Sequence, residues 1–383
     1  MKKILNISAL LYGKATNGIF QQIHILMHAD DATVIADNRK TATEKLKSLL
    51  YYCNLNSILP QYDKCEFITI NGDIDDNLPL TFGSRFIQNV NYITLLGSHL
   101  SQDGSLKEDI SLHMKKRYSS CIKFYNFIRS NKGAPISVKI KVLKSCVLGS
   151  LLYNCETFGN VIPKELESLY IKLIKSAFGV RPNTPTLLLY IESNFLPLKA
   201  LVYSRQLKYY RRFMQCLPEG SSRKNLLNKL GINPSPYLKH YITLNEKYDN
   251  CNDIFTEYKD IMKNKIWKLS NERHYKYEIY AKLNPDLSAP RDLLHSLHPI
   301  ASDIIRFRLG SHNLPIEIGR WNRIPRCQRM CLTCNTIGDE EHALFDCDMV
   351  DRSGLILSRN IAEIWSQDDI FKLFIKLKDE KII

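Results

Sequence analysis

Three cysteines and one histidine near the C-terminal end have the spacing of a metal site. Cys331, Cys334, His342 and Cys347 follow the pattern C-x2-C-x7-H-x4-C. A C-x2-C turn presents two thiolates, and the H-x4-C pair supplies the two further ligands that Zn²⁺ takes in a tetrahedron. We therefore predict one structural zinc ion held by these four residues. Cys327 lies close enough in the sequence to replace one of them.

A filled set of four ligands leaves no open position for catalysis, so the predicted role of this zinc is to shape a surface. An arginine-rich stretch precedes the cluster, and we expect it to contact phosphates. Its members are Arg306, Arg308, Arg320, Arg323, Arg326 and Arg329.

Two adjacent aspartates form a second group that could do chemistry. Asp30 and Asp31 stand between two apolar, β-rich runs within residues 19–37, a pattern that predicts a hairpin with acids at the bend. Paired carboxylates next to apolar strands are stable where they face water or a cation. Mg²⁺ is commonly held by one or two carboxylates together with substrate phosphates, as in polymerases. The alternative interpretation is a solvated turn, since Asp is a common turn residue.

The charge of the chain indicates a polyanionic partner. The formal net charge is +14 over 383 residues, which favours nucleic acid or an anionic membrane. Residues 115–144 contain no Asp or Glu and nine basic residues: Lys115, Lys116, Arg117, Lys123, Arg129, Lys132, Lys139, Lys141 and Lys144. A second group, Arg205, Lys208, Arg211 and Arg212, has spacings that place it near one helix face. For either run alone, an ordinary solvated helix surface is an equal alternative.

Composition and patterning favour a reduced, globular, α+β protein. The chain has 11 cysteines, an odd number without a secreted disulfide pattern, so we expect an intracellular setting, in the nucleus or the cytoplasm. No apolar run reaches the ~18 residues of a membrane span, and we expect no membrane partner. The first seventy residues are predicted as strand, strand, helix and strand, with the helix over 41–52. Residues 111–217 are predicted as helices broken near 133–135, 159–163 and 181–183.

The order of several short segments resembles the reverse transcriptases of non-LTR (LINE-type) retrotransposons. His28-Ala29-Asp30-Asp31 is similar to their aromatic-Ala-Asp-Asp signature, and Lys64-Cys65-Glu66-Phe67-Ile68 to the lysine-containing segment after the palm helix. Further matching segments are Leu95-Leu96-Gly97 with Asp103-Gly104 (primer grip), Leu152 to Thr157 (thumb), Arg308 to His312, Gly319-Arg320 and the Cys/His cluster. The resemblance covers about residues 22–352.

The resemblance implies an RNA-directed DNA polymerase whose partners are an RNA template and a DNA target or primer. Asp30 and Asp31 would ligate Mg²⁺, and Lys64 would assist at the leaving pyrophosphate. The implied organisation is a truncated palm (1–80), a primer grip and helical thumb (81–180), a helical linker (181–290), and an Arg-rich, zinc-binding segment (291–383). It implies nothing about the oligomeric state.

Departures from the family pattern bear on catalysis. His28 stands where the family has Tyr or Phe, Gln61 where it tends to have Asn, and Leu95 where it has Tyr. Residues 1–29 contain no Asp or Glu, so the family's first catalytic aspartate has no counterpart there. We therefore expect an N-terminally truncated polymerase, inactive alone. The alternatives are a non-catalytic, zinc-containing nucleic-acid-binding protein derived from such an element, and an unrelated zinc protein.

Overall fold

The computed structural model describes residues 3–12, 25–70, 78–105, 107–216 and 236–383, with side chains for 25–70, 78–105, 109–216 and 238–383. The described residues form an α+β fold, as the sequence predicts. They group into two compact units. The first comprises residues 1–116, 157–161 and 209–243, and the second 117–156, 162–208 and 244–383.

The first unit is organised by a mixed sheet. Its strands run in the order β2-β3-β1-β5-β7-β6, and β4 also pairs with β1. β1 is parallel to both β3 and β5, whereas β2 and β3 form an antiparallel hairpin. The strand bounds are β1 Lys3–Tyr12, β2 Ile25–His28, β3 Asp31–Ala36, β4 Ile58–Pro60, β5 Glu66–Ile70, β6 Leu80–Phe82 and β7 Arg85–Asn89.

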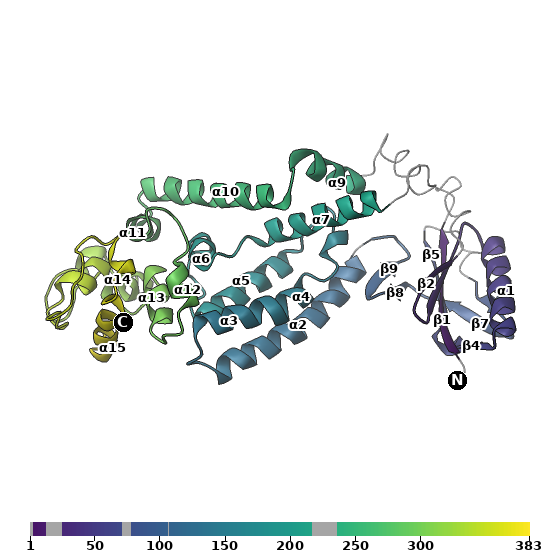
Figure 1. The fold of residues 1–383 in the computed structure, drawn as a ribbon, viewed down its shortest axis with the longest axis horizontal. Helices are drawn as coiled ribbons and strands as arrows, with labels where there is room; N and C mark the ends of the chain where they lie inside the picture. Colours follow the sequence, from purple (N-terminus) through teal and green to yellow (C-terminus); the bar gives the residue numbers. More distant parts are fainter. Residues whose placement is uncertain (1–2, 13–24, 71–77, 106, 217–235) are drawn as a thin grey trace. The chain divides into compact units, whose positions relative to one another are not determined.

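Alternation along β3 and β5 sends side chains to two different cores, one on each face of the sheet. On one face Val34 and Phe67 pack with Leu46 of helix α1 (Arg39–Leu55). Figure 1 shows α1 lying against the sheet. On the other face, Ile35 and Ile68 pack with Ile93 of the hairpin formed by β8 (Tyr92–Leu95) and β9 (Ser98–Ser101). The sheet is therefore the middle layer of the first unit.

The predicted hairpin and helix of the first unit are confirmed, with different ends. α1 begins at Arg39, earlier than predicted, because the side chain of Asn38 accepts a hydrogen bond from the Thr41 N–H and caps the helix. β1 and β4 were not predicted. Residues 19–24 of the predicted hairpin and the predicted Asn71-Gly72 turn lie outside the described residues.

Helices account for most of the second unit and for segments that join it to the first. Their bounds are α2 Lys107–Ser130, α3 Ile136–Val142, α4 Leu148–Leu151, α5 Lys164–Phe178, α6 Thr186–Ser193, α7 Leu198–Gln215, α9 Pro236–Lys247, α10 Cys251–Asn271, α11 Tyr275–Leu283, α12 Arg291–His295, α13 Ala301–Arg308, α14 Pro315–Trp321 and α15 Ile370–Asp379. The predicted breaks are confirmed, since Pro135, Pro163 and Pro185 directly precede α3, α5 and α6. Gly179, with a φ of 63°, ends α5 in the left-handed conformation.

The four segments expected from the sequence do not coincide with these two units. Residues 81–180 are divided between them, and most of 181–290 shares the second unit with 291–383. Helices within 181–290 build a core of their own. Leu207 of α7, Leu244 of α9 and Ile254 of α10 are buried together. Apolar residues recurring between the lysines of these helices provide that buried face.

A buried ion pair connects distant parts of the second unit. Arg308 of α13 donates from Nε to Glu192 Oε1 of α6 at 2.5 Å, and the two residues are 116 positions apart. Tyr280 of α11 donates its hydroxyl to Glu192 Oε2 at 2.8 Å, and Asn284 donates to the Tyr280 hydroxyl at 3.1 Å. The Arg308 guanidinium also lies over the ring of Trp365. Each charged group is buried together with its partner, as a stable interior requires.

We predict that Arg308→Ala lowers the free energy of unfolding of the second unit by about 3 to 5 kcal/mol, because it leaves the Glu192 carboxylate buried without its charge partner. Replacing both partners with apolar residues, as Arg308→Met with Glu192→Leu, should recover much of the loss. The matched control is Lys268→Ala, whose ion pair with Glu272 is exposed. That change should cost less than about 0.5 kcal/mol. Denaturant unfolding followed by tryptophan fluorescence measures all three, and equal effects of Arg308→Ala and Lys268→Ala would contradict the prediction.

Candidate zinc centre and nucleic-acid interface

A tight turn presents the first two cysteines of the cluster. The Cys331 N–H donates to the Thr336 carbonyl at 2.7 Å, and the Asn335 N–H donates to the Cys331 carbonyl at 3.1 Å. Asn335 has a φ of 51°, a left-handed conformation that Asn tolerates better than most residues. These bonds reverse the chain so that the side chains of Cys331 and Cys334 point to one place.

The second pair of donors completes the cluster. Donor atoms of Cys331, Cys334, His342 and Cys347 all lie within 4.8 Å of one another. The sulfurs of Cys334 and Cys347 are 3.9 Å apart. Two sulfurs each about 2.3 Å from a tetrahedral zinc ion would be separated by roughly 3.8 Å, so the spacing fits this metal. Among the described residues, no other group of three or more His, Cys, Asp or Glu side chains comes this close.

The histidine is held in a metal-binding orientation. His342 Nδ1 lies 3.2 Å from the Thr336 hydroxyl, which can fix the ring from outside the cluster. His342 Nε2 is buried and has no hydrogen-bond partner in the described part of the chain. A buried ring nitrogen without a partner is unfavourable unless it binds a ligand. The fifth cysteine, Cys327, is exposed and is not part of the cluster.

The cluster already favours a thiolate. Burial opposes ionisation of Cys331, but hydrogen bonds from the backbone of Cys334 and Thr333, together with the nearby side chains of His342 and Cys334, lower its pKa to about 6. For Cys334, a hydrogen bond from the Asp348 N–H lowers the pKa, but burial and the neighbouring Cys331 and Cys347 side chains raise it overall to about 11. With no cation present, one thiol of this pair therefore ionises well before the other, and a bound Zn²⁺ would favour both thiolates.

Buried polar contacts attach the zinc-binding segment to the helices. Glu340, next to the cluster, accepts hydrogen bonds from the Tyr275 hydroxyl at 2.8 Å and from His312 Nε2 at 3.2 Å. Tyr275 lies on α11, and His312 belongs to the Arg308–His312 segment singled out in the sequence. This segment therefore holds the zinc-binding region in place.

The arginine-rich stretch before the cluster is mostly engaged within the protein, contrary to our expectation of phosphate contacts. Arg308 is buried against Glu192, Arg320 pairs with Glu317, and Arg326 lies 3.6 Å from Asp339. Arg329 donates to the Ile324 and Ile316 carbonyls. Arg320 finds its partner within its own helix, whereas Glu192 and Asp339 are distant in the sequence from Arg308 and Arg326, so spacing alone does not reveal those two pairings. Arg323 is exposed.

The two aspartates lie at the tip of the β2–β3 hairpin, as predicted, and both are exposed. Ala29, the first turn residue, has a φ of 53°. A cavity of about 470 Å³ adjoins this tip and is lined by Asp31 and Lys64, two of the three predicted catalytic residues. Asp30 does not line it. Glu66, the first residue of β5, adds a second carboxylate that the sequence analysis did not identify as a site residue.

The remaining lining residues come from β2, β3, β8 and the β8–β9 turn: Leu26, Met27, His28, Thr33, Thr94, Leu95 and Leu96. Leu95 and Leu96 belong to the segment that resembles a primer grip. Alternation explains part of the set, because Asp31 shares a sheet face with Thr33, and Glu66 shares one with Ile68. The cavity therefore lies on the face that the β8–β9 hairpin covers.

Most of the basic residues between 115 and 144 are exposed. The exposed ones are Lys115, Lys116, Lys123, Arg129, Lys132, Lys141 and Lys144. Arg117 is the main exception, since it is 1% exposed and donates from Nη2 to the Tyr153 carbonyl at 2.7 Å. Lys139 is buried and donates to the Lys132 carbonyl at 2.9 Å. Arg117 faces the protein interior because it lies four and three residues after His113 and Met114, on the buried side of α2. It is therefore not exposed as a phosphate contact would be.

The second basic group, on α7, is less uniform than its spacing suggests. Lys208 and Arg212 are exposed. Arg205 is partly buried, donates to the Leu152 carbonyl at 3.2 Å and lies 3.5 Å from Glu156. Arg211 is partly buried and engaged in interactions of its own. Only Lys208 and Arg212 therefore keep the exposure expected of phosphate contacts.

Comparison with protein families, curated proteins and solved structures found no match to this chain. In the described part of the chain, no helix combines the length and apolar character needed to cross a membrane. No disulfide bond joins the cysteines, all of which are described.

We predict one zinc ion per chain in freshly purified, reduced protein. Cys334→Ser should lower zinc content well below one ion, because it removes one of four donors that lie together. Cys327→Ser is the matched control and should leave zinc content unchanged, since that thiol lies outside the cluster. Atomic emission on dialysed protein measures both. Zinc-free parent protein, or equal loss in the two variants, would refute the assignment.

Proposed function

We propose that this chain binds nucleic acid, in the manner of the thumb and C-terminal region of the reverse transcriptases that it resembles. One observation carries the proposal: seven basic side chains between residues 115 and 144 are exposed, and no acidic residue interrupts them. A surface of one sign attracts a polyanion over several kT. The duplex formed by an RNA template and a DNA primer presents regularly spaced phosphates to such a surface.

Helix α2 supports the proposal by its geometry. Lys115, Lys116, Lys123 and Arg129 lie on its exposed side, whereas Cys121 and Phe124 lie on its buried side. Tyr118 and Ile122 are also exposed on that helix, at 49% and 56%. An exposed aromatic beside cations suits stacking on a base as well as contact with phosphate. The helix therefore offers both kinds of contact that nucleic acids use.

The zinc ion would have a structural role in this function. Its four ligands would fill the coordination shell, so the metal would add folding free energy to the segment that carries them. Zinc binding would also fix the position of Glu340 and, through it, of the polar contacts to α11. We expect loss of zinc to loosen this region and to leave the basic surface of α2 intact.

Nucleotidyl transfer is the second candidate function, and the cavity of the first unit is the observation that favours it. Asp31 and Lys64 line one cavity, as the resemblance requires of a metal ligand and a residue that assists the leaving pyrophosphate. Mg²⁺ could bind there through carboxylates and substrate phosphates. Glu66 is the one further carboxylate among the lining residues. The first catalytic aspartate of the family has no counterpart in residues 1–29.

We predict that Lys115→Ala with Lys116→Ala weakens binding to an RNA–DNA duplex regardless of sequence. The slope of log K against log salt should flatten by up to about two units, since each phosphate contact contributes roughly 0.9. The buried Arg117 is kept unchanged, because replacing it would disturb the helix. The matched control is Lys265→Ala with Lys268→Ala, two exposed lysines of α10, a helix that also carries acidic residues. Equal effects of the two pairs, or salt-insensitive binding by the parent chain, would contradict the proposal.

We also predict that primer extension by this chain in Mg²⁺ stays near background. Loss of a partner of a metal ligand already costs roughly 10 to 100-fold, and a missing ligand should cost more. Asp30→Ala should leave duplex binding almost unchanged, or slightly tighter, because it removes an exposed negative charge. Asp31→Asn and Glu66→Gln change carboxylates that line the cavity, and their primer extension and duplex binding are compared with those of Asp30→Ala. Robust extension that depends on Asp31 would establish the second candidate function instead.

A further inference from the structure

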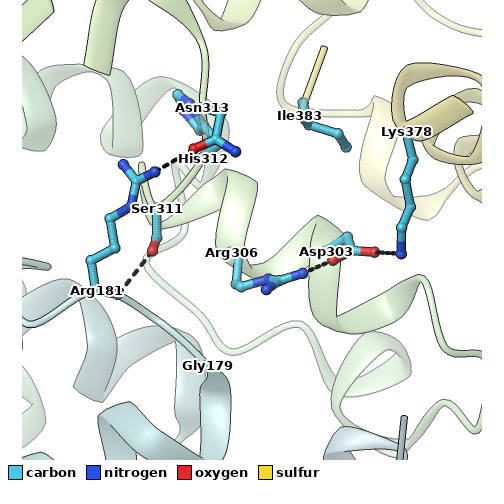
Figure 2. A pocket seen from close by; sticks show the side chains of 9 residues that line it. All are labelled: Gly179, Arg181, Asp303, Arg306, Ser311, His312, Asn313, Lys378 and Ile383. Carbon is cyan, nitrogen blue, oxygen red and sulfur yellow. Dashed lines mark hydrogen bonds and ion pairs between the residues drawn. The ribbon is translucent and has the colours of Figure 1, made fainter. Parts of the chain in front are cut away.

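A small basic pocket in the second unit lies apart from the zinc cluster. It has a volume of about 230 Å³. Figure 2 shows that its four charged side chains come from three places in the sequence: Arg181 after α5, Asp303 and Arg306 on α13, and Lys378 on α15. Gly179, Ser311, His312, Asn313 and Ile383 complete the lining.

Arg181 is fixed in position and still has an unused donor. Its backbone N–H donates to Ser311 Oγ at 3.0 Å, and its Nη2 donates to Asn313 Oδ1 at 2.6 Å. The guanidinium carbon lies over the ring of Trp321, 3.5 Å from the ring centroid. Nη1 is buried and has no hydrogen-bond partner among the described residues. A buried charged donor without an acceptor is costly, so this group points to a ligand that supplies an oxygen.

The acidic residue of the pocket is already shared by two cations. Asp303 pairs with Arg306 through one oxygen, and Lys378 Nζ lies 2.9 Å from the other. Figure 2 shows the carboxylate between them. Arg181 interacts electrostatically with Glu317, but that carboxylate is already paired with Lys276 and Arg320. The lining of the pocket therefore contains three cationic side chains and one anionic side chain, and only Arg306 and Lys378 contact that carboxylate. Burial, and then the nearby Arg181 charge, lower the pKa of Arg306, so the two guanidinium groups are close enough to repel each other.

We propose that this pocket binds a phosphate group, with Arg181 and Arg306 as its principal contacts and Lys378 at its edge. A phosphate has several acceptor oxygens and up to two negative charges, which match two guanidinium groups better than a single carboxylate does. The source of that phosphate is either the 5′ end of a bound nucleic acid or a free phosphate. The first source rests on the proposed nucleic-acid binding, and the second does not.

The test uses the full, zinc-loaded chain and three probes. Inorganic phosphate is titrated by calorimetry and by thermal denaturation. Two single-stranded DNA oligonucleotides of one sequence, with a 5′-phosphate and with a 5′-hydroxyl, are titrated by fluorescence anisotropy. We expect phosphate to bind and to raise the melting temperature. We also expect the 5′-phosphorylated strand to bind more tightly than the strand with a 5′-hydroxyl.

Arg181→Gln and Arg306→Gln should each weaken phosphate binding by roughly 10 to 100-fold, the loss of one or two charge-assisted hydrogen bonds. Arg306→Gln leaves Asp303 paired with Lys378, so this variant tests the pocket even if Arg181→Gln does not fold. The matched control is Arg359→Gln, which removes an equal charge at an 84% exposed position outside the pocket. It should bind phosphate like the parent.

The outcomes separate the pocket from the proposed function. Phosphate binding that is lost in both pocket variants, with no preference between the two strands, supports the pocket and assigns it to a free phosphate. The same loss without any oligonucleotide binding also supports the pocket but removes the proposed function. The inference is overturned if the parent chain does not bind phosphate, or if all three arginine variants bind it equally.

Discussion

The second unit depends on burying the Arg308 charge with that of Glu192. A charge removed from water must be matched by an opposite charge and by hydrogen bonds, or its burial is costly. Because Arg308 and Glu192 are 116 residues apart, meeting this requirement brings α13 to α6. Tyr280 adds α11 to the same network. The ion pair between Arg308 and Glu192 therefore positions the chain that follows α13, including the segment with the candidate zinc ligands.

The residues directly after Arg308 extend this arrangement in two directions. Ser311 accepts a hydrogen bond from the Arg181 backbone, which fixes the loop after α5 and one wall of the basic pocket. His312 contacts the buried Glu340, which lies beside the first residues of the helical turn that carries His342. One short segment therefore links the ion pair, the pocket and the candidate zinc centre. Ser311 and His312 both form hydrogen bonds within the protein, so they are less accessible to a ligand than the sequence alone suggests.

Much of the candidate zinc site could be predicted from the sequence, because its ligands are close in the chain and the turn that presents them is local. The hairpin at Asp30 and the breaks before α3, α5 and α6 were predictable for the same reason. The exposure of the basic residues, by contrast, could not be predicted from local sequence. Lys116 and Arg117 are adjacent and equally charged, yet one is exposed and the other buried. Their difference follows from what packs against each side of α2, which charge counting does not include.

Long-range pairing sets the other limit. Glu66 is brought to the cavity of Asp31 and Lys64 by the parallel pairing of β3 and β5 with β1, a register that no local pattern specifies. Most arginines of the C-terminal stretch pair with carboxylates or carbonyls of the protein, Arg306 and Arg320 within their own helices and Arg308 across 116 residues. Fewer of them are therefore unpaired than the sequence suggests. The largest group of basic residues that stays exposed in the structure is the one between residues 115 and 144.

Lysine acetylation followed by mass spectrometry, with and without a bound RNA–DNA duplex, tests that conclusion most directly. Chemical acetylation reports the accessibility of each lysine separately, so it distinguishes a bound surface from a general loss of charge. The account predicts that the duplex protects Lys115, Lys116, Lys123, Lys141 and Lys144, while Lys265 and Lys268 of α10 react as they do in the free protein. Protection of the α10 lysines with unchanged reactivity at residues 115–144 would contradict it.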